Sequence, residues 1–104
     1  MLESRVAELA SAAELLSAVA DPIRLQLIDL LASGPSCVCD LQADVPIPSN
    51  LLSYHLKVLR EAGLIVGTRR GRWIDYALTD GALDRLHAAL PGANAPARQL
   101  VVVR

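Results

Sequence analysis

One stretch decides the fold of this chain, and it reads Pro48-Ser49-Asn50-Leu51-Leu52-Ser53-Tyr54-His55-Leu56-Lys57-Val58-Leu59-Arg60-Glu61-Ala62-Gly63. Three of its leucines recur at helical spacing, namely Leu52, Leu56 and Leu59. This spacing predicts an amphipathic helix whose apolar stripe faces a core. We expect the helix to begin at Ser49 and to stop at Gly63.

The opposite face of this predicted helix carries hydrogen-bonding groups, an aromatic ring and one positive charge. Its residues are mainly Asn50, Ser53, Tyr54 and Lys57. A helix face that only meets solvent is normally richer in Glu and Lys. We therefore predict that this face contacts another molecule, and the flanking segments suggest duplex DNA.

Upstream of this stretch, apolar periodicity predicts helices over about residues 2–19 and 22–32. Asp21 is a suitable N-cap for the second of them, and Pro22 suits a first helical position. Residues 37–44 are too few for an independent helix, but they fit the short first helix of a helix-turn-helix. Residues 45–48 would then form the turn, stiffened by Pro46 and Pro48.

Downstream of Gly63, residues 64–68 and 73–78 read as two strands joined by a basic, glycine-containing turn over residues 69–72. A basic hairpin directly after such a helix is a wing. Thr79 or Asp80 is expected to cap a last helix that closes at Pro91-Gly92. The predicted fold is mainly α with a small β-hairpin wing, in one domain over residues 1–92. The role of the tail, residues 93–104, stays open between packing on a dimer and a short strand.

Charge is unevenly distributed along the 104 residues, whose net charge is −1. Residues 1–48 hold seven acidic and two basic side chains, whereas residues 49–76 hold five basic and two acidic ones. A local basic patch matters more for nucleic-acid binding than the average charge. No apolar run reaches the roughly 18–20 residues that cross a bilayer, and no secretory signal is evident. We expect a cytoplasmic protein with free thiols and no membrane partner.

Four motifs resemble the ArsR/SmtB family of winged helix-turn-helix metal-sensing repressors. They are Ala20-Asp21-Pro22-Ile23-Arg24-Leu25, Ser36-Cys37-Val38-Cys39-Asp40-Leu41, Ser53-Tyr54-His55-Leu56-Lys57-Val58-Leu59-Arg60-Glu61-Ala62-Gly63-Leu64 and Gly71-Arg72-Trp73-Ile74-Asp75-Tyr76. The resemblance covers about residues 15–80. It implies a homodimer through the first and last helices that binds a pseudo-palindromic double-stranded operator and releases it when metal binds.

In the helix-turn-helix geometry, the second helix lies in the major groove with its N-terminal residues at base edges. The candidate DNA contacts are Ser49, Asn50, Leu51, Ser53, Tyr54, His55, Lys57 and Arg60 of the helix, and Arg69, Arg70 and Arg72 of the wing. His55 matches a family position near DNA, but the alternative is that it holds the fold. Leu51 departs from the polar residue usual in the family, and either touches a thymine methyl or buries itself. For Trp73 and Tyr76 we favour packing of the hairpin onto the helices over a binding role.

Cys37 and Cys39 are the candidate metal ligands, because thiolates are preferred by As(III), Sb(III), Cd(II) and Pb(II). On a regular helix, residues two apart point about 200° away from each other, so both would reach one ion only if the first turn were distorted. Such distortion would move the following helix and release DNA. A helix N-terminus is also expected to lower a cysteine pKa. The alternative is that Cys37 and Cys39 are only small, buried apolar residues of the core.

The resemblance also restricts the inducer. Where arsenic sensors often have a third cysteine, this chain has Gln42, and residues 1–36 lack the cysteines of the cadmium/lead branch. His87 has the wrong spacing for the zinc-type site on the last helix, and we expect it at the surface or an interface. Two-thiolate As(III), completed by hydroxide or a small thiol, is the preferred state.

Three other functions compete with that of a metal-responsive repressor. The same cysteines would serve a regulator that responds to thiol oxidation, although an intramolecular disulfide at this spacing is strained. A winged helix that only binds proteins fits poorly with the basic wing. An enzyme is not expected, because the chain lacks a Cys-x-x-Cys pair and an arginine placed for an oxyanion loop.

Overall fold

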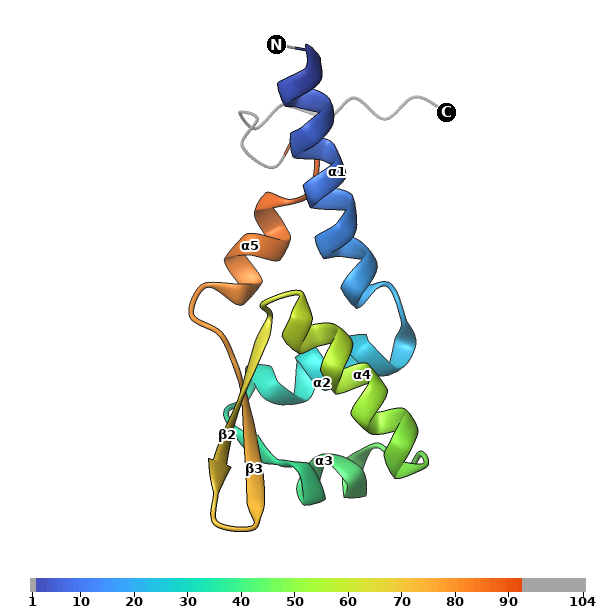
Figure 1. Cartoon of the computed structure of the whole chain (residues 1–104), viewed down its shortest axis with the longest axis vertical. Helices are drawn as coiled ribbons and strands as arrows, with labels where there is room; N and C mark the ends of the chain where they lie inside the picture. The colour runs from blue at the N-terminus through green and yellow to red at the C-terminus, as the bar shows by residue number, and fades with distance from the viewer. Residues whose placement is uncertain (1, 93–104) are drawn as a thin grey trace, which may run out of the picture.

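Five helices and three short strands make up the computed structural model, which describes residues 2–92 (Figure 1). In chain order they are α1 (Leu2–Val19), α2 (Pro22–Ala32), β1 (Ser36–Cys37), α3 (Val38–Asp44), α4 (Ser49–Glu61), β2 (Ile65–Arg70), β3 (Trp73–Leu78) and α5 (Ala82–Ala88). The predicted class, mainly α with a hairpin wing, is confirmed. No helix among the described residues is long and apolar enough to cross a membrane.

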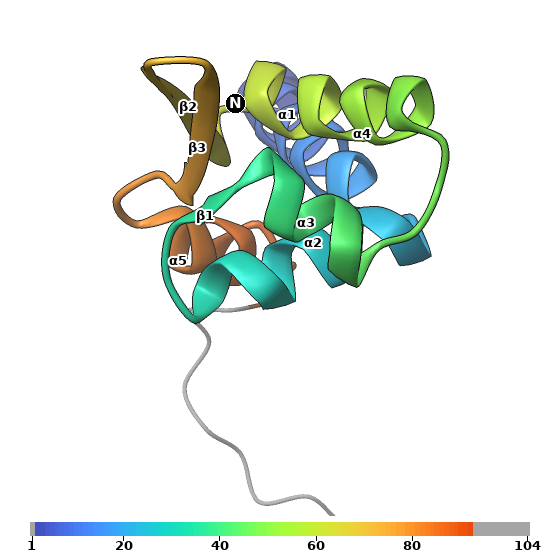
Figure 2. The same cartoon turned by 90° about the horizontal axis from the view of Figure 1, so that it is seen from below.

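The helix-turn-helix consists of α3 and α4, which pack with α2 around a leucine-rich core (Figure 2). Its most deeply buried side chains are Leu27, Leu41, Val45, Leu52, Leu56, Leu59, Leu64 and Ile65. The predicted leucine stripe of α4 is therefore confirmed. Apolar burial of this kind stabilises a domain by about 1.5–3 kcal/mol per fully buried side chain.

Helix α4 begins at Ser49 and ends just before Gly63, close to the predicted limits. Pro48 occupies the N-cap position and makes no side-chain cap bond. At the other end, Gly63 has φ +75°, a conformation that glycine adopts without strain. Its N–H donates to Arg60 O at 2.9 Å, and the Leu64 N–H donates to Leu59 O at 3.1 Å. These two bonds form a Schellman motif, which satisfies the last carbonyls of the helix.

The turn between α3 and α4 is held by a side chain. Gln42 Nε2 donates to Ile47 O and, at 3.5 Å, to Val45 O, while Val45 itself is buried. The position at which the resemblance leads us to expect a third cysteine is thus used to fix the turn.

The sheet has the strand order β1-β3-β2 and is antiparallel throughout. β1 was not predicted, because its partners Asp75 and Tyr76 lie far along the chain from Ser36 and Cys37. The hairpin was predicted, but Arg69 and Arg70 belong to β2 and not to the turn. On the inner face of the hairpin, a Cβ at Gly67 would meet Tyr76 at 3.0 Å, so any larger residue would require that ring to shift by a few tenths of an ångström.

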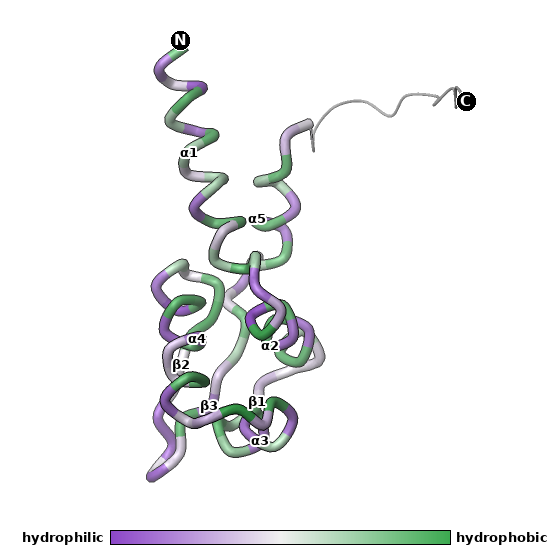
Figure 3. Tube along the Cα trace, turned by 90° about the vertical axis from the view of Figure 1, so that its right-hand side faces the viewer, coloured by the Kyte–Doolittle hydropathy of each residue, from purple (hydrophilic) through white to green (hydrophobic). Residues whose placement is uncertain are grey.

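Helix α1 projects along the long axis of the molecule and lies beside α5 (Figure 1). Its C-terminal part contacts α2 and α4, while its N-terminal part extends away from them. Both helices contain hydrophobic residues, which are green in Figure 3, and expose several large apolar side chains. They are Leu2, Val6 and Leu9 of α1 and Leu83 of α5, together with Leu90 just after α5. In the chain as described, α1 buries only Ala18 fully.

Asp21 caps α2 and Pro22 is its first residue, as predicted. The predicted cap of the last helix is wrong, since α5 is preceded by Gly81 with φ +74° and has no side-chain cap bond. Thr79 instead donates its hydroxyl to Gly63 O at 2.7 Å. This bond ties the end of the wing to the end of α4. The predictions for residues 93–104 lie outside the described residues.

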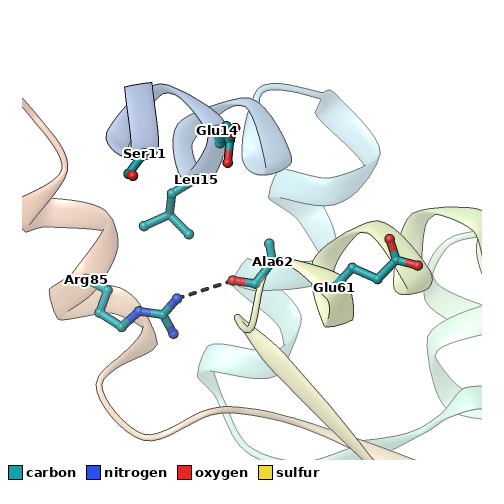
Figure 4. Close-up of a pocket in the computed structure, with 6 residues that line it drawn as sticks. All are labelled: Ser11, Glu14, Leu15, Glu61, Ala62 and Arg85. Atoms are coloured by element: carbon teal, nitrogen blue, oxygen red, sulfur yellow. Dashed lines mark hydrogen bonds between the residues drawn. The ribbon is translucent and has the colours of Figure 1, made fainter. Parts of the chain in front are cut away.

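A pocket of about 360 Å³ lies between α1, the end of α4 and α5 (Figure 4). Arg85 reaches across it from α5, with Nη1 donating to Gly63 O at 2.8 Å and Nη2 to Ala62 O at 3.2 Å. A guanidinium at these carbonyls complements the negative end of the helix dipole. α5 is thereby tied directly to the C-terminus of α4.

Candidate nucleic-acid interface and metal site

The outer face of α4 is exposed over its whole length. The predicted contact residues that lie on it are Ser49, Asn50, Leu51, Ser53, Tyr54, Lys57 and Arg60. Leu51 is 42% exposed, so of its two predicted alternatives burial within the chain is excluded. The tip of the hairpin lies along the same side of the molecule as α4 (Figure 2). A polar helix and a basic hairpin therefore form one surface.

His55 is the exception on α4, because its side chain points inward and is only 6% exposed. Arg24 Nη1 lies 2.9 Å from His55 Nδ1. Since arginine can only donate, this ring nitrogen accepts the bond. Arg24 Nε also donates to Ala18 O at 2.7 Å, and Asp21 Oδ1 lies 4.0 Å from Nδ1. His55 holds α4 to the corner between α1 and α2, which is the alternative that the sequence left open.

Two of the basic candidates have acidic neighbours. Arg70 Nε lies 3.0 Å from Asp75 Oδ2, and Lys57 Nζ lies 3.7 Å from Glu61 Oε1. Exposed pairs of this kind are worth at most about 1 kcal/mol, so a phosphate can compete for either cation. Arg69, Arg72 and Arg60 are exposed as well.

The two aromatic residues of β3 behave differently. Tyr76 is 7% exposed and packs in the core, as predicted. Trp73 is 52% exposed, so the prediction that it packs the hairpin onto the helices is wrong. The physical reason is strand alternation, which places Trp73 and Tyr76 on opposite faces of β3.

Cys37 lies outside helix α3 and serves as its N-cap, in extended conformation with φ −76° and ψ 157°. Its Sγ accepts a hydrogen bond from Asp40 N at 3.4 Å. Because only Cys39 is helical, the two thiols do not diverge as they would on a continuous helix. Sulfur atoms of Cys37 and Cys39 and a carboxylate oxygen of Asp40 all lie within 4.8 Å of one another. The expected need to distort the helix is therefore wrong.

This donor set fits a metal or metalloid ion. Thiolates around a tetrahedral ion are about 3.7 Å apart, as follows from metal–sulfur bonds of about 2.3 Å. Small side-chain rotations suffice to close the remaining gap. Cys39 and Asp40 are exposed and Cys37 is half-buried. The alternative that both cysteines are only buried apolar residues is therefore wrong. Asp40 was missed as a donor, although its place three residues after a cap resembles a capping box.

The pKa of Cys37 is raised, mainly because its thiol is hydrogen-bonded with that of Cys39. The backbone N–H of Asp40 acts in the opposite direction, but it does not prevail. The expectation that the helix N-terminus lowers the pKa of this cysteine is therefore wrong. An ion that binds here must displace a proton, which couples binding to pH.

His87 is exposed on α5, as expected for a surface or interface residue.

Comparison with known proteins gives a consistent picture. The model of the family described as bacterial regulatory protein, arsR family, matches residues 21–66. The arsenical resistance operon repressor of Bacillus subtilis is 40% identical over 70 residues, covering 66% of this chain and 67% of that protein. An SmtB transcriptional repressor homologue of Synechocystis is 40% identical over 75 residues, covering 72% of this chain but 57% of that protein. The chain thus spans little more than half the length of the SmtB relative.

A crystal structure described as a possible transcriptional regulator for arsenical resistance superposes with a TM-score of 0.68 at 39% identity, covering 72% of this chain and 78% of that chain.

Proposed function

Because the chain belongs to the arsR family of bacterial regulatory proteins, we propose that it is a dimeric, cytoplasmic repressor that releases operator DNA when a soft metal or metalloid binds Cys37 and Cys39. The family consists of regulators, which agrees with the expectation that the chain is not an enzyme. The observation that carries the proposal is the pairing of two features. An exposed polar helix lies beside a basic hairpin, and a cluster of two thiols and a carboxylate lies at the start of the adjoining helix.

The DNA side rests on the arrangement of α4 and the hairpin. In a helix-turn-helix, the N-terminal residues of the second helix reach base edges in the major groove. Here these are Ser49, Asn50 and Ser53, with Leu51 available for a thymine methyl. Tyr54, Lys57 and Arg60 follow along the same face as phosphate contacts, and the wing adds Arg69, Arg70 and Arg72.

The dimer rests on the exposed apolar side chains of α1 and of the α5 region. A second copy that packs against them would remove this surface from water, as the resemblance implies. It would also place two α4 helices in successive turns of the major groove.

As(III) or Sb(III) is the preferred inducer, because the chain supplies two thiolates and the Bacillus relative is named for arsenical resistance. A hydroxide or a small thiol would complete the shell of As(III). Asp40 raises the expected affinity for Cd(II) and Pb(II) relative to As(III). A carboxylate oxygen suits a divalent cation better than it suits a metalloid that prefers sulfur. Divalent metals are therefore the alternative inducers.

The route from sensor to DNA runs through α3. Ligation rotates the Cys37 thiol toward the ion, and the thiol gives up its bond from Asp40 N. Helix α3 then loses its N-cap, which destabilises the helix whose Gln42 fixes the turn to α4. Movement of α3 therefore shifts the DNA-contacting helix in both protomers. A few kcal/mol of preference for the shifted state suffices for release.

The test is DNA binding by fluorescence anisotropy, with a labelled duplex that the wild-type protein selects from a random-sequence pool. Arsenite or antimonite at micromolar levels is expected to abolish DNA binding. The intensity of the thiolate-to-metal absorption band should correspond to two bound thiolates per chain. Titrations with Cd(II) and Pb(II) give the ranking. Unchanged DNA affinity at saturating metal or metalloid would exclude the inducer part of the proposal.

Substitutions of the ligands separate folding from sensing. Cys37→Ser keeps an N-cap acceptor, so α3 is expected to form normally while the response is lost. Cys39→Ser should also bind DNA without responding. Asp40→Asn should weaken Cd(II) and Pb(II) binding while leaving As(III) binding within about twofold. Normal induction of either serine variant would contradict the two-thiolate site.

A thiol-oxidation sensor is the second candidate, favoured by the exposure of Cys39 and by the proximity of its sulfur to that of Cys37. Peroxide would then abolish DNA binding, and arsenite would not.

A further inference from the structure

Trp73 is the single tryptophan of the chain, and it stands exposed at the end of the hairpin. It opens β3, directly opposite Arg70 in the antiparallel register. Residues directly opposite share a face, so the ring and the Arg70 side chain lie on the same face of the hairpin. Ile74 and Tyr76 take the other face, against Gly67 and the core. Trp73 is not among the described side chains that pack against the core.

The surroundings of the ring are strongly cationic. Arg70 lies opposite Trp73 on the same face, and Arg72 is next to Trp73 in the turn, whereas Arg69 pairs with Ile74 on the other face. Asp75 offsets the charge of Arg70 through its bond to that side chain. A large apolar ring beside Arg70 and Arg72 is complementary to a surface that alternates apolar and anionic groups. Duplex DNA offers such a surface at its edge, where deoxyribose rings lie between phosphates.

We propose that Trp73 packs against deoxyribose of the operator at the minor groove that flanks the site of α4, while the neighbouring arginines hold the phosphates. This inference rests on the proposed function. The hairpin tip lies on the same side of the molecule as α4, so the contact continues the surface that α4 presents (Figure 2). A second copy of this chain is a poorer occupant, because its own hairpin would bring a second set of arginines against the first.

An apolar contact of this kind has a distinct physical signature. Neutralising a phosphate releases counterions, so each lost arginine contact reduces the slope of log affinity against log salt by about 0.9. Removing the tryptophan contact releases no counterions. Trp73 is therefore expected to raise DNA affinity without affecting its salt dependence, and with little regard to base sequence.

The first experiment uses the protein unchanged. Because Trp73 is the only tryptophan, its emission reports this site alone. Without DNA, the emission should be that of a solvated ring and open to quenching by acrylamide, which is uncharged. Adding the selected duplex should shift the emission to shorter wavelength and protect the ring from acrylamide. A random-sequence duplex at low salt should do the same.

The second experiment compares variants. Trp73→Ala should weaken binding to the selected duplex about tenfold with an unchanged salt slope. Trp73→Phe should restore most of the affinity. Arg72→Ala is the matched comparison at the tip, since it should weaken binding and lower the slope. Val66→Thr, an exposed apolar position nearer the base of the same hairpin, should leave affinity unchanged. Urea unfolding of each variant separates loss of contact from loss of the hairpin.

The outcomes are distinguishable. If the selected duplex binds by anisotropy but the emission and quenching of Trp73 do not change, the inference is overturned and the proposed function stands. A salt slope that falls in Trp73→Ala also overturns it, because the ring would then act through the phosphates. Emission that shifts with protein concentration in the absence of DNA assigns the ring to a chain–chain interface instead. Failure of the wild-type protein to bind any duplex rejects both proposals.

Discussion

Cys37 is at once the last residue of a strand and the cap of a helix. This double role brings its sulfur within reach of Cys39 and Asp40, because a capping residue has extended torsions and lies outside the helical spiral. It also means that the same sulfur atom serves folding before any ion arrives. In the proposed metal complex, the capping bond from Asp40 N would be given up as the thiolate turns to the ion.

Asp21 gives a prediction at the same scale. Its carboxylate accepts the N–H groups of Arg24 and Ile23, and the bond from Arg24 is the main cause of its lowered pKa. A lowered pKa in the folded chain stabilises the fold above the ordinary aspartate value of about 3.9, and this stabilisation is lost as the pH falls through that value toward the lower folded one. Asp21→Asn keeps the cap but cannot titrate.

The urea midpoint of Asp21→Asn should therefore lie below that of the wild type near neutral pH, and the gap should close as the pH falls from about 6 to about 3. Asp29→Asn, exposed in the same helix, changes the net charge equally and serves as the control. A gap that stays constant over this range would show that the carboxylate charge has no part in the cap.

The sequence predicted those residues whose role depends on near neighbours. The Leu52, Leu56 and Leu59 stripe and the Asp21-Pro22 cap are local patterns, and both are confirmed. Its failures concern partners distant in the chain. The inward-facing side chain of His55 is bonded to Arg24, and the extended backbone of Cys37 pairs with Asp75 of β3. For Trp73, the alternation of side chains along a strand predicts that successive residues lie on opposite faces of β3, but it does not identify which face packs on the core.

At the scale of elements, α4 is fixed at three places. The turn from α3 holds its beginning, His55 its middle and Arg85 its end. The last of these comes from α5, so the two helices cannot move independently without breaking two hydrogen bonds. Patterns of single helices predicted none of these connections, because each joins a side chain to a group outside its own helix. Gln42 and Arg85 bond to backbone carbonyls, and His55 bonds to the Arg24 side chain.

Arg85→Ala should lower the free energy of unfolding by about 0.5–1.5 kcal/mol, since it removes a cation and two hydrogen bonds from the carboxyl end of α4. Urea unfolding measures the loss, and faster amide exchange of Gly63 and Leu64 should locate it at the Schellman motif. His87→Ala, exposed on the same helix, is the matched control. Equal exchange in both variants would mean that the Schellman motif holds the end of α4 without Arg85.

At the scale of the whole molecule, α1 accounts for the elongated shape. It extends beyond the core and exposes Val6 and Leu9 in the chain as described (Figure 3). A long helix gains most of its stability from tertiary packing of its apolar face. A second copy supplies such packing in the proposed dimer.

Leu9→Glu should therefore convert the protein to monomers in sedimentation and lower its DNA affinity more than tenfold, because each monomer reaches only one half-site. Leu25→Glu places the same charge on a leucine of α2 that is more exposed than Leu9, and it should leave the assembly intact. A dimer that persists in Leu9→Glu would assign the interface to another surface.

The exposure of Cys39 and Asp40 bears on how fast a regulated gene can respond. These residues begin α3 and are not part of α4 or the hairpin tip, so the operator need not cover them. In the proposed repressor, an inducer would therefore reach the thiols while the protein is still bound to DNA, and the ion would accelerate release. The delay before transcription would then be set by the arrival of the ion, even when the undisturbed complex with DNA has a long lifetime.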